Sequence, residues 1–442
     1  MRRLTLAVLL AVIALPLAAQ GTERLTTLTL DEALSLAKRY NPTYLEQVNN
    51  QRATALGVRS AYAAFFPSVS SSMGFSWREG KQTFIEGQPF GAATNVLGSN
   101  YSIGVNVGYS VASILQPKHA AAQVDAADAT VTATEQDVRQ QVTMQYFTAV
   151  QAVRNADLQD SLVASQQLQF QLAQARERIG SGITLDTKNA EVALRRQELA
   201  ALRAHNAADL ERIRLFEFIG VPSPAAGSVS LTTDLPVTEP AFKLADLLAD
   251  MMAHNATLAA NRANERAAAI GKRQANGSYI PSIGLNTGLG GQTSMFTNAT
   301  GADRTWPFSF DRNPLTVSVG LQLQLWDGFR REQNTQSSAI ALTNAQHELR
   351  RAELQLTTGV TSLYTELVND WRAVQLQIQI VETARQALLL AQERYRVGST
   401  AYTDFALAQD RYQQEENARL VDIYTYHRTF AQLEAAVGRP LR

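Results

Sequence analysis

The sequence predicts a mainly helical protein that also carries membrane-spanning β-strands, and three observations support this fold class. The chain of 442 residues is 45% hydrophobic but only 7% aromatic, which suits helices rich in Ala, Leu and Gln better than a compact aromatic core. The chain also repeats itself once, in two halves. Each half contains two segments in which apolar and polar residues alternate strictly, and this alternation is typical of β-strands.

Charge and cysteine content exclude several classes of protein. The 40 basic residues are balanced by 40 acidic ones, whereas a nucleic-acid-binding protein carries a basic excess. The chain contains no cysteine, which excludes a disulfide framework, a thiolate metal site, a cysteine nucleophile and a lipidated cysteine.

The first 19 residues predict a secretory signal peptide. Arg2 and Arg3 precede an apolar run that ends in the small residues Ala18 and Ala19. The alternative is a transmembrane anchor, but the run is shorter than the ~20 residues that a spanning helix needs. We therefore expect an exported mature protein without a membrane helix.

Matching landmarks define the repeat. The segment Phe65–Val69 recurs as Tyr279–Ile283, and Arg178–Ser181 recurs as Arg396–Ser399, in the same order. We expect a first repeat over 20–221, a linker rich in Pro, Ser, Thr and Gly over 222–241, and a second repeat over 242–442. A short broken helix opens each repeat, with Asn41 before Pro42 as a capping signature.

The alternating segments predict strands at about 67–78, 101–112, 281–290 and 315–326. Their polar faces consist of Ser, Gly, Asn and Gln and carry almost no charge, unlike the solvent face of a soluble antiparallel sheet. Each segment has about the length of a tilted membrane-spanning strand. Aromatic residues lie toward the strand ends, as in the girdle of a membrane barrel; they are Trp77, Tyr101, Tyr109, Tyr279 and Trp326. These features favour a membrane β-barrel over a soluble sheet.

Four strands cannot close a membrane barrel, because open sheet edges are not tolerated in lipid and the smallest barrels have about eight strands. The chain must therefore oligomerise. Arithmetic alone permits a dimer with eight strands or a trimer with twelve. The uncharged polar faces predict a water-filled passage.

The remaining sequence predicts two very long helices, at about 118–178 and 330–396, and at 1.5 Å per residue the first of them spans roughly 90 Å. A heptad pattern runs along the second one; its members are Val360, Tyr364, Leu367, Trp371, Val374, Ile378 and Val381. A weaker seam in the first long helix consists of Val142, Tyr146, Ala149, Val153 and Ala156. Returning helices at about 187–218 and 404–436 follow turns that contain Gly180, Gly182 and Gly398.

This order of elements, given twice behind a signal peptide, resembles the TolC-like outer membrane efflux protein family, over essentially the whole mature chain. The sharpest local matches are Tyr395–Ser399 through Asp404, its partner Arg178–Gly180 through Asp186, and Leu30–Leu34 followed by Asn41. Because the chain has no cysteine to acylate, it looks like the non-lipidated branch. The resemblance implies a homotrimer with a 12-stranded β-barrel in the outer membrane and an α-helical barrel that crosses the periplasm.

The resemblance also implies partners and a function. It implies docking to a periplasmic adaptor (membrane fusion) protein and to an inner-membrane pump or ABC exporter. The chain would then be the exit duct of a tripartite efflux pump or a type I secretion system, in contact with outer-membrane lipid and not with nucleic acid.

The family pattern assigns expected site residues at the ends of the hairpins. The channel constriction is expected at Asp404, Asp186 and Tyr395, and the adaptor-docking tips are expected at Gly180, Val397, Gly398 and Ser399. Two positions depart from the best-known members, which carry an arginine where this chain has Thr400 and an aspartate where it has Leu407. The network that closes the channel is therefore expected to be thinner here.

Competing chemistry finds no support in the sequence. The five histidines show no metal-ligand spacing, and no nucleophile and base can be paired. Gly288–Gly291 lacks the strand-to-helix context of a phosphate loop. We therefore expect no enzyme activity, cofactor or metal. The main alternative is a periplasmic coiled-coil scaffold or adaptor without a pore, which would explain the helices but not the alternating segments.

Overall fold

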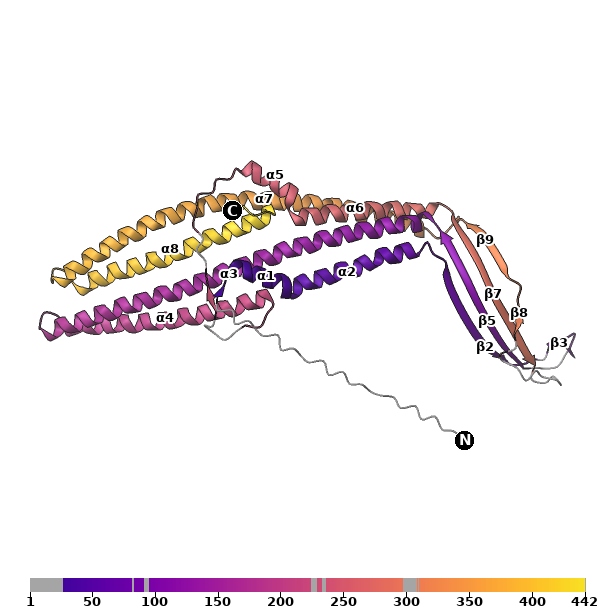
Figure 1. Cartoon of the computed structure of the whole chain (residues 1–442), viewed down its shortest axis with the longest axis horizontal. Helices are drawn as coiled ribbons and strands as arrows, with labels where there is room; N and C mark the ends of the chain where they lie inside the picture. Colours follow the sequence, from indigo (N-terminus) through magenta and orange to yellow (C-terminus); the bar gives the residue numbers. More distant parts are fainter. Residues whose placement is uncertain are drawn as a thin grey trace, which may run out of the picture.

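The molecule is elongated, with a β-sheet at one end and the turns of two helical hairpins at the other (Figure 1). The computed structural model describes residues 27–81, 83–90, 95–223, 229–232, 236–296, 308 and 310–441. The expected signal peptide over 1–19 lies outside the described residues. Among the described residues, no helix combines the length and apolarity that crossing a membrane requires.

Two long helices dominate the fold. Helix α3 spans Val111–Arg178 and α7 spans Arg330–Arg396, and at 1.5 Å per residue each is about 100 Å long. Each turns back as a helix of 36 residues, α4 at Thr184–Ile219 and α8 at Tyr402–Val437. Helix α3 begins earlier than the expected residue 118, because Ser110 caps it and the helix continues through Pro117, a residue that usually ends helices.

A pair of short helices opens each repeat, as expected. They are α1 (Leu30–Tyr40) and α2 (Pro42–Ala63) in the first, and α5 (Leu244–His254) and α6 (Ala256–Asn276) in the second. The predicted cap is confirmed, because the Asn41 side chain accepts a hydrogen bond from the Tyr44 amide at 3.1 Å. Asn255 caps α6 in the same way, through the Leu258 amide at 3.0 Å.

The same asparagines join each short helix pair to the returning helix. Asn41 donates from Nδ2 to the Phe218 carbonyl at 2.8 Å, and Asn255 donates to the Ala436 carbonyl at 2.9 Å. Gly220 ends α4 at a φ of +88°, and a Cβ at this position would lie 2.6 Å from the Tyr40 carbonyl oxygen. Only glycine fits there, because the end of α4 lies in close contact with the backbone between α1 and α2.

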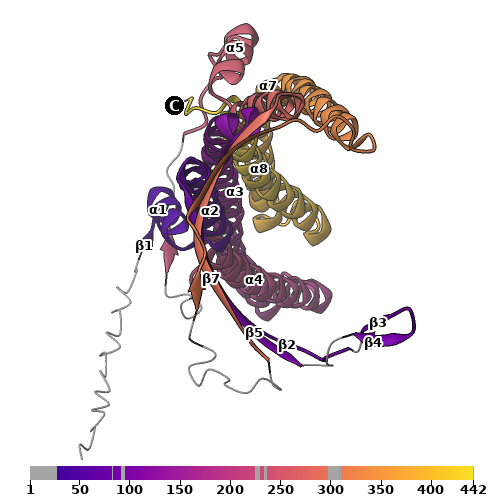
Figure 2. The same cartoon turned by 90° about the vertical axis from the view of Figure 1, so that its right-hand side faces the viewer.

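The sheet is a single curved layer (Figure 2). Strands β2 (Ser68–Arg78), β5 (Val96–Tyr109), β7 (Ser282–Phe296) and β9 (Thr316–Gln322) are antiparallel and follow that order across the sheet, and the two-residue strand β8 (Asp311–Arg312) also pairs with β7. The two repeats meet where β5 pairs with β7. A small hairpin of β3 (Thr83–Ile85) and β4 (Gln88–Phe90) follows β2.

The strand bounds correct the sequence prediction. Strand β5 begins at Val96 rather than 101 and ends at Tyr109 rather than 112, because the capped helix α3 takes over at Val111. Strand β7 continues to Phe296, beyond the expected 290, because β5 offers it a partner along that whole length. Strand β9 ends at Gln322 instead of 326, since its partner β7 begins at Ser282, the residue paired with Gln322.

Four apolar clusters hold the described helices together, the smallest being Ala156, Ala204 and Ala208 between α3 and α4. One lies where α1, α3, α4 and α8 meet beside a two-stranded parallel sheet of β1 (Thr27–Leu28) and β6 (Ser230–Leu231), and the buried Tyr146 hydroxyl lies 2.8 Å from the carbonyl oxygens of Leu28 and Thr232. A second cluster lies between α5, α7 and α8, and a third lies at the hairpin tips.

The predicted seams are largely confirmed. In α7, Val360, Leu367, Val374 and Val381 are buried, whereas Ile378 is 46% exposed and was wrongly placed in the seam. In the first repeat, Val142, Tyr146, Ala149 and Ala156 are buried. The core of the hairpins also contains the buried amides Gln159, Gln166, Gln169 and Gln409.

Candidate functional site at the hairpin tips and the sheet

Two short turns form the tips of the hairpins, as the sequence predicts. Gly180 and Gly398 adopt the left-handed conformation, with φ of +75° and +77°. In each turn, amides that follow the helix bond back to its last carbonyls, for example Gly398 to Tyr395 at 3.0 Å and Ser399 to Arg394 at 2.9 Å. These hydrogen bonds satisfy the last backbone carbonyls of the helix. The turn that forms them needs a residue that tolerates positive φ.

The four residues expected to dock a partner all lie exposed at these turns: Gly180, Val397, Gly398 and Ser399. Apolar side chains protrude beside them, since Ile179 is 79% exposed and Val397 is 67% exposed. An apolar side chain presented to water at the end of a hairpin is a suitable contact for another protein.

Tyr395, expected at the constriction, is buried in an aromatic cluster at the second tip. Its ring lies 5.6 Å from Phe405 and 5.8 Å from Tyr402 between centroids. Ala173 and Ala190 of the first hairpin pack against the same cluster. Tyr395 therefore lies between the two tips of one chain.

Asp186 lies close to this cluster, in the first turn of α4. Burial raises the pKa of Tyr395, and the negative charge of Asp186 raises it further. Burial also raises the pKa of Tyr402 to about 12, with smaller contributions from Tyr395 and Asp186. Both phenols are therefore neutral at physiological pH.

Asp404, the third residue that the resemblance assigns to the constriction, lies in the first turn of α8. It is exposed and accepts a hydrogen bond from the Thr400 hydroxyl at 2.6 Å. An acidic residue there also complements the helix dipole. Leu407, one turn further on, is 51% exposed.

Arg176 is the tip residue that sequence reasoning missed. Its Nη1 donates to the Tyr395 carbonyl at 2.6 Å, and its guanidinium carbon lies 4.6 Å from the centroid of the Tyr395 ring. The sequence contains several arginines near the two turns, at 176, 178, 394 and 396. Nothing local distinguishes the one that reaches the other hairpin.

The sheet is the second functional feature, because the described residues of its outer strands lie open to solvent. Residues of the outer strands β2 and β9 are exposed on both faces. The pairing aligns polar residues on one face in rows, such as Ser68, Asn106, Asn286 and Ser318. Apolar residues form the rows on the other face, such as Val107, Leu285 and Val319.

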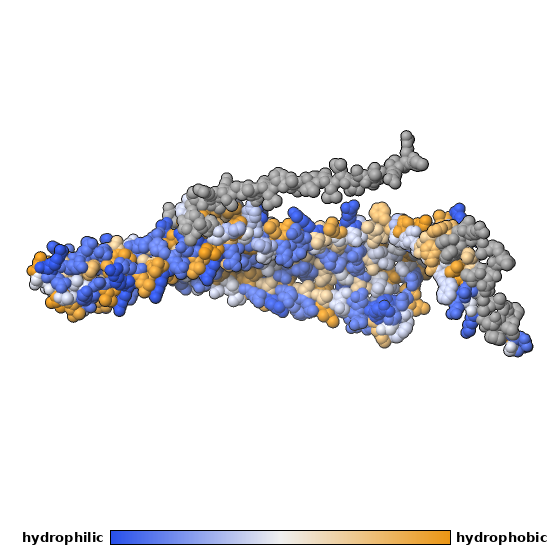
Figure 3. Space-filling view, turned by 90° about the horizontal axis from the view of Figure 1, so that it is seen from below, coloured by the Kyte–Doolittle hydropathy of each residue, from blue (hydrophilic) through white to orange (hydrophobic). Residues whose placement is uncertain are grey.

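Four of the five predicted aromatic residues lie at or near the ends of the strands, whereas Tyr101 lies inside β5, because that strand begins at Val96. Trp77 is 62% exposed, Tyr279 is 49% exposed and Trp326 is 68% exposed. The helical part differs, because hydrophilic residues cover most of the face seen in Figure 3, with hydrophobic ones scattered among them. In the described part of the chain, no group of three His, Cys, Asp or Glu side chains is placed to hold a metal ion.

Comparison with known proteins identifies the family. The model of the outer membrane efflux protein family matches residues 33–221 and 247–439, which is most of the chain. The chain belongs to the outer membrane efflux protein family. Members of this family are transport proteins, so the chain is not an enzyme.

Individual members show the extent of the likeness. Protein CyaE of Bordetella pertussis is 26% identical over 349 residues, which cover 78% of this chain and 70% of CyaE. The outer membrane protein VceC of Vibrio cholerae has the same fold, with a TM-score of 0.76 at 16% identity over 93% of this chain and 97% of VceC. The MtrE outer membrane channel of Neisseria gonorrhoeae, solved in its open state, gives a TM-score of 0.73 at 16% identity over 93% of this chain and 89% of MtrE.

Proposed function

We propose that three copies of this efflux-family chain form a channel-tunnel through the outer membrane and the periplasm. The four main strands of each copy build a 12-stranded β-barrel, and the long hairpins build an α-helical barrel below it. The channel is the exit duct of a tripartite efflux pump or a type I secretion system for small molecules or proteins.

One observation carries this proposal, the single-layer sheet with one apolar and one uncharged polar face. In a soluble protein the apolar rows would need a covering layer, because burying such side chains is the main driving force for folding. Lipid supplies that cover when the sheet closes into a barrel, and the polar rows then line a water-filled lumen. Closure also removes the free edges of β2 and β9.

The helices at the two edges of the helical layer support assembly from identical copies. Helix contacts give the order α4–α3–α8–α7 near the tips and α2–α3–α6–α7 near the sheet, so one edge comes from the first repeat and the other from the second. Figure 2 shows these helices along an open arc. The α4 edge carries exposed apolar residues at spacings of 7, 7 and 3, typical of a helix that awaits a partner helix; they are Leu185, Val192, Leu199 and Leu202.

We further propose roles for the tip residues. Gly180, Val397, Gly398 and Ser399 dock a periplasmic adaptor, which in turn connects the channel to an inner-membrane pump or ABC exporter. Asp404 forms the narrowest ring of the channel, and Asp186 and Tyr395 hold the tips in position around it.

Native mass and bilayer conductance together test the proposed function. Purified in detergent after signal-peptide removal, the protein should have three times the mass of the mature chain and should form pores in planar bilayers. A monomer or dimer as the conducting species would contradict the trimer. Release of the protein from membranes by urea or carbonate, with no pores formed, would favour the alternative of a periplasmic scaffold.

A further inference from the structure

We propose that a belt of basic and aromatic residues, where the helices meet the sheet, binds the anionic phospholipids of the adjoining membrane leaflet. This basic belt consists of the four segments within about three helical turns of the sheet, which are 56–67, 111–121, 271–281 and 323–333. Its place at a membrane surface rests on the proposed function, which puts the sheet in the outer membrane and the helices in the periplasm. The lipids are then those of the periplasmic leaflet.

The charge of these four segments differs from that of the whole chain. The chain has 40 basic and 40 acidic residues, whereas the four segments together have six cations and only two carboxylates, Asp327 and Glu332. Every segment supplies at least one of the cations, which are Arg59, Lys118, Lys272, Arg273, Arg330 and Arg331. The excess positive charge therefore follows the whole row of helices beside the sheet.

The four segments lie together at one end of the molecule, where α2, α3, α6 and α7 reach the sheet (Figure 1). Gln274 near the end of α6 donates to the Ala112 carbonyl at the start of α3 at 3.3 Å. The Tyr109 hydroxyl at the end of β5 donates to the Phe65 carbonyl at 3.0 Å, just after α2. These contacts hold the segments at a common level, so their cations form one belt.

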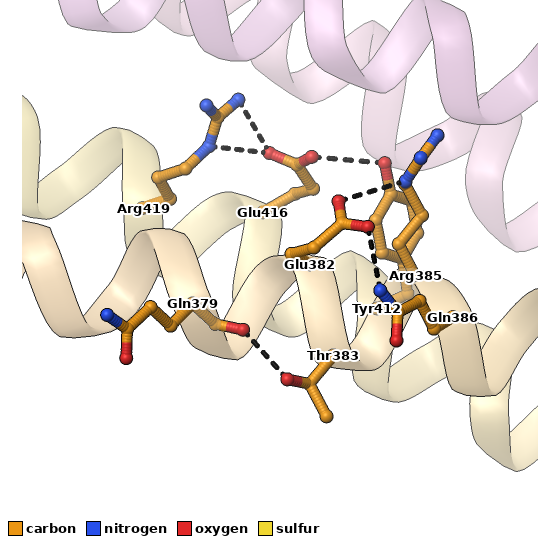
Figure 4. A network of polar contacts seen from close by, with 8 residues as sticks. All are labelled: Gln379, Glu382, Thr383, Arg385, Gln386, Tyr412, Glu416 and Arg419. Atoms are coloured by element: carbon orange, nitrogen blue, oxygen red, sulfur yellow. Dashed lines mark hydrogen bonds and ion pairs between the residues drawn. The ribbon is translucent and has the colours of Figure 1, made fainter.

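Most cations of the basic belt have no acidic partner. Within the described part of the chain, Arg331 pairs with Asp327 at 3.2 Å, and the other five cations form no ion pair. Figure 4 shows a different situation along the hairpins, where Arg385 pairs with Glu382 at 3.2 Å on the same helix. A cation that is already paired attracts an external anion weakly, whereas the unpaired cations of the belt keep their full field.

Exposed apolar side chains lie on the sheet side of these cations. Tyr62 lies three residues from Arg59 in α2, and Ile114 lies four residues from Lys118 in α3, so each pair shares one face of its helix. The other exposed apolar residues of the belt are Phe66, Tyr279, Ile280, Trp326 and Phe329. Apolar groups next to the sheet, followed by long cationic side chains, fit the boundary between acyl chains and phosphate groups.

The corner between β9 and α7 is the best-defined part of the belt. Phe329 adopts the left-handed conformation, with a φ of +65°, which is sterically unfavourable for a bulky residue. Its exposed ring packs on that of Trp326 at 4.8 Å between centroids. Arg331 fixes the corner, because it binds Asp327 and its guanidinium carbon lies 5.1 Å from the centroid of the Tyr279 ring.

This arrangement is suited to a lipid surface. Aromatic rings favour the membrane interface, which gives the exposed pair at the corner the environment that water does not. The cations come from four segments and are spread along the belt, as many separate headgroups require. Phosphodiesters of anionic lipids are attracted to such juxtamembrane cations.

The test uses Trp326 as a reporter within the belt. The chain has four tryptophans, so Trp77→Phe, Trp306→Phe and Trp371→Phe leave Trp326 as the only one. This parent is inserted into vesicles that mix phosphatidylcholine with phosphatidylglycerol, and either lipid is brominated in turn. Quenching of Trp326 then gives the preference of the belt for the anionic lipid. Native mass spectrometry of the protein with all its tryptophans counts the phosphatidylglycerol that it retains.

We expect a clear preference for phosphatidylglycerol that falls at high salt. Replacing two unpaired, exposed cations together, Arg273→Gln with Arg330→Gln, should lower this preference about tenfold and reduce the retained phosphatidylglycerol. The matched control is Arg178→Gln with Arg394→Gln, which removes two exposed cations at the opposite end of the molecule. The control should leave both measurements unchanged.

Phe329→Gly tests the aromatic part of the belt. Glycine adopts the left-handed conformation without strain, so a purely local role predicts an unchanged or more stable corner. A role at the interface predicts instead that Trp326 moves toward water, with red-shifted emission and weaker quenching by brominated acyl chains. Phe329→Tyr keeps an interfacial ring and should behave like the parent.

Four results would contradict the belt. They are equal quenching by the two lipids in the parent, an unchanged preference in the double variant, and unchanged Trp326 emission and quenching in Phe329→Gly. The fourth is a double variant that shifts the reversal potential of the channel but not the lipid preference, which would place the cations in the lumen. A wild-type protein that does not insert into vesicles would contradict the proposed channel function as well, whereas insertion without lipid preference contradicts the belt alone.

Discussion

Two asparagines show how a single side chain can serve two parts of the fold. Asn41 accepts from the Tyr44 amide, which begins α2, and donates to the Phe218 carbonyl, which lies at the end of α4. Asn255 repeats both contacts in the second half of the chain. An amide can do this because its oxygen accepts while its nitrogen donates, whereas an aspartate could only accept.

Asp404 is the residue on which the proposed constriction depends. Three copies around the axis of a trimer would form an acidic ring that favours cations and binds multivalent ones. We therefore expect Asp404→Asn to raise the multivalent cation concentration needed for half-block of single channels about tenfold and to lower cation selectivity. The cation is added on the side of the hairpin tips.

Leu407 and Thr400 provide the controls for the acidic ring. Leu407→Asp, one helical turn away on the same exposed face, should strengthen both block and selectivity. Thr400→Val removes the hydroxyl that binds Asp404 but keeps the carboxylate, so block should persist. Unchanged block in Asp404→Asn would leave Asp404 as a helix-terminal residue and would place the constriction elsewhere.

The strands show how the environment of an element follows from its register. In β5, Val105 pairs with Val69 and Thr287, and its neighbour Asn106 pairs with Ser68 and Asn286. Adjacent residues of one strand thus belong to opposite faces, apolar and polar. This alternation gives a matched pair of positions with the same place along the barrel axis.

Arginine at these two positions should therefore have opposite effects. Val105→Arg should destabilise the inserted barrel by roughly 2–4 kcal/mol if the residue lies near the bilayer midplane. Asn106→Arg should leave insertion intact and shift ion selectivity toward anions. Folding into lipid vesicles, followed by denaturant titration and reversal potentials, measures both effects. Equal damage from the two substitutions would contradict the assignment of the faces.

At the scale of the whole molecule, the sheet and the tips occupy opposite ends (Figure 1). A helix of about 100 Å separates them, so a change in exposed tip residues should not reach the sheet. Membrane insertion and partner contact are therefore separable properties of this chain. Their separation can be tested at Val397, which is exposed and has no part in the tip cluster.

We expect Val397→Asp to abolish export in cells while trimer mass and bilayer conductance stay normal. The charge would have to be buried without a partner in an apolar contact with the adaptor. Val397→Thr keeps the shape of the side chain and should retain most export. Loss of the trimer in Val397→Asp would show that the turn is needed for assembly rather than for docking.

Much of the architecture could be predicted because its signals are local. The cap at Asn41 and the turns at Gly180 and Gly398 follow from side-chain chemistry within a few residues. The seam from Val360 to Val381 follows from the helical period, although Ile378 shows that a heptad pattern can include a residue on the exposed side. The predicted strand ends were less accurate, because the pairing partners on other strands decide where β7 and β9 end.

The sequence by itself determined which segments are helices and strands, since periodicity and capping depend on neighbouring residues, and its internal repeat and order of elements indicated the family. Only the tertiary structure decided which expected site residues come together. It brings Asp186 to Tyr395, leaves Asp404 beside Thr400, and selects Arg176 among the arginines near the turns. The physical reason is that the contacts of Asp186 and Arg176 with Tyr395 depend on how two hairpins pack across a gap of about 200 residues in sequence, and no local pattern encodes that packing.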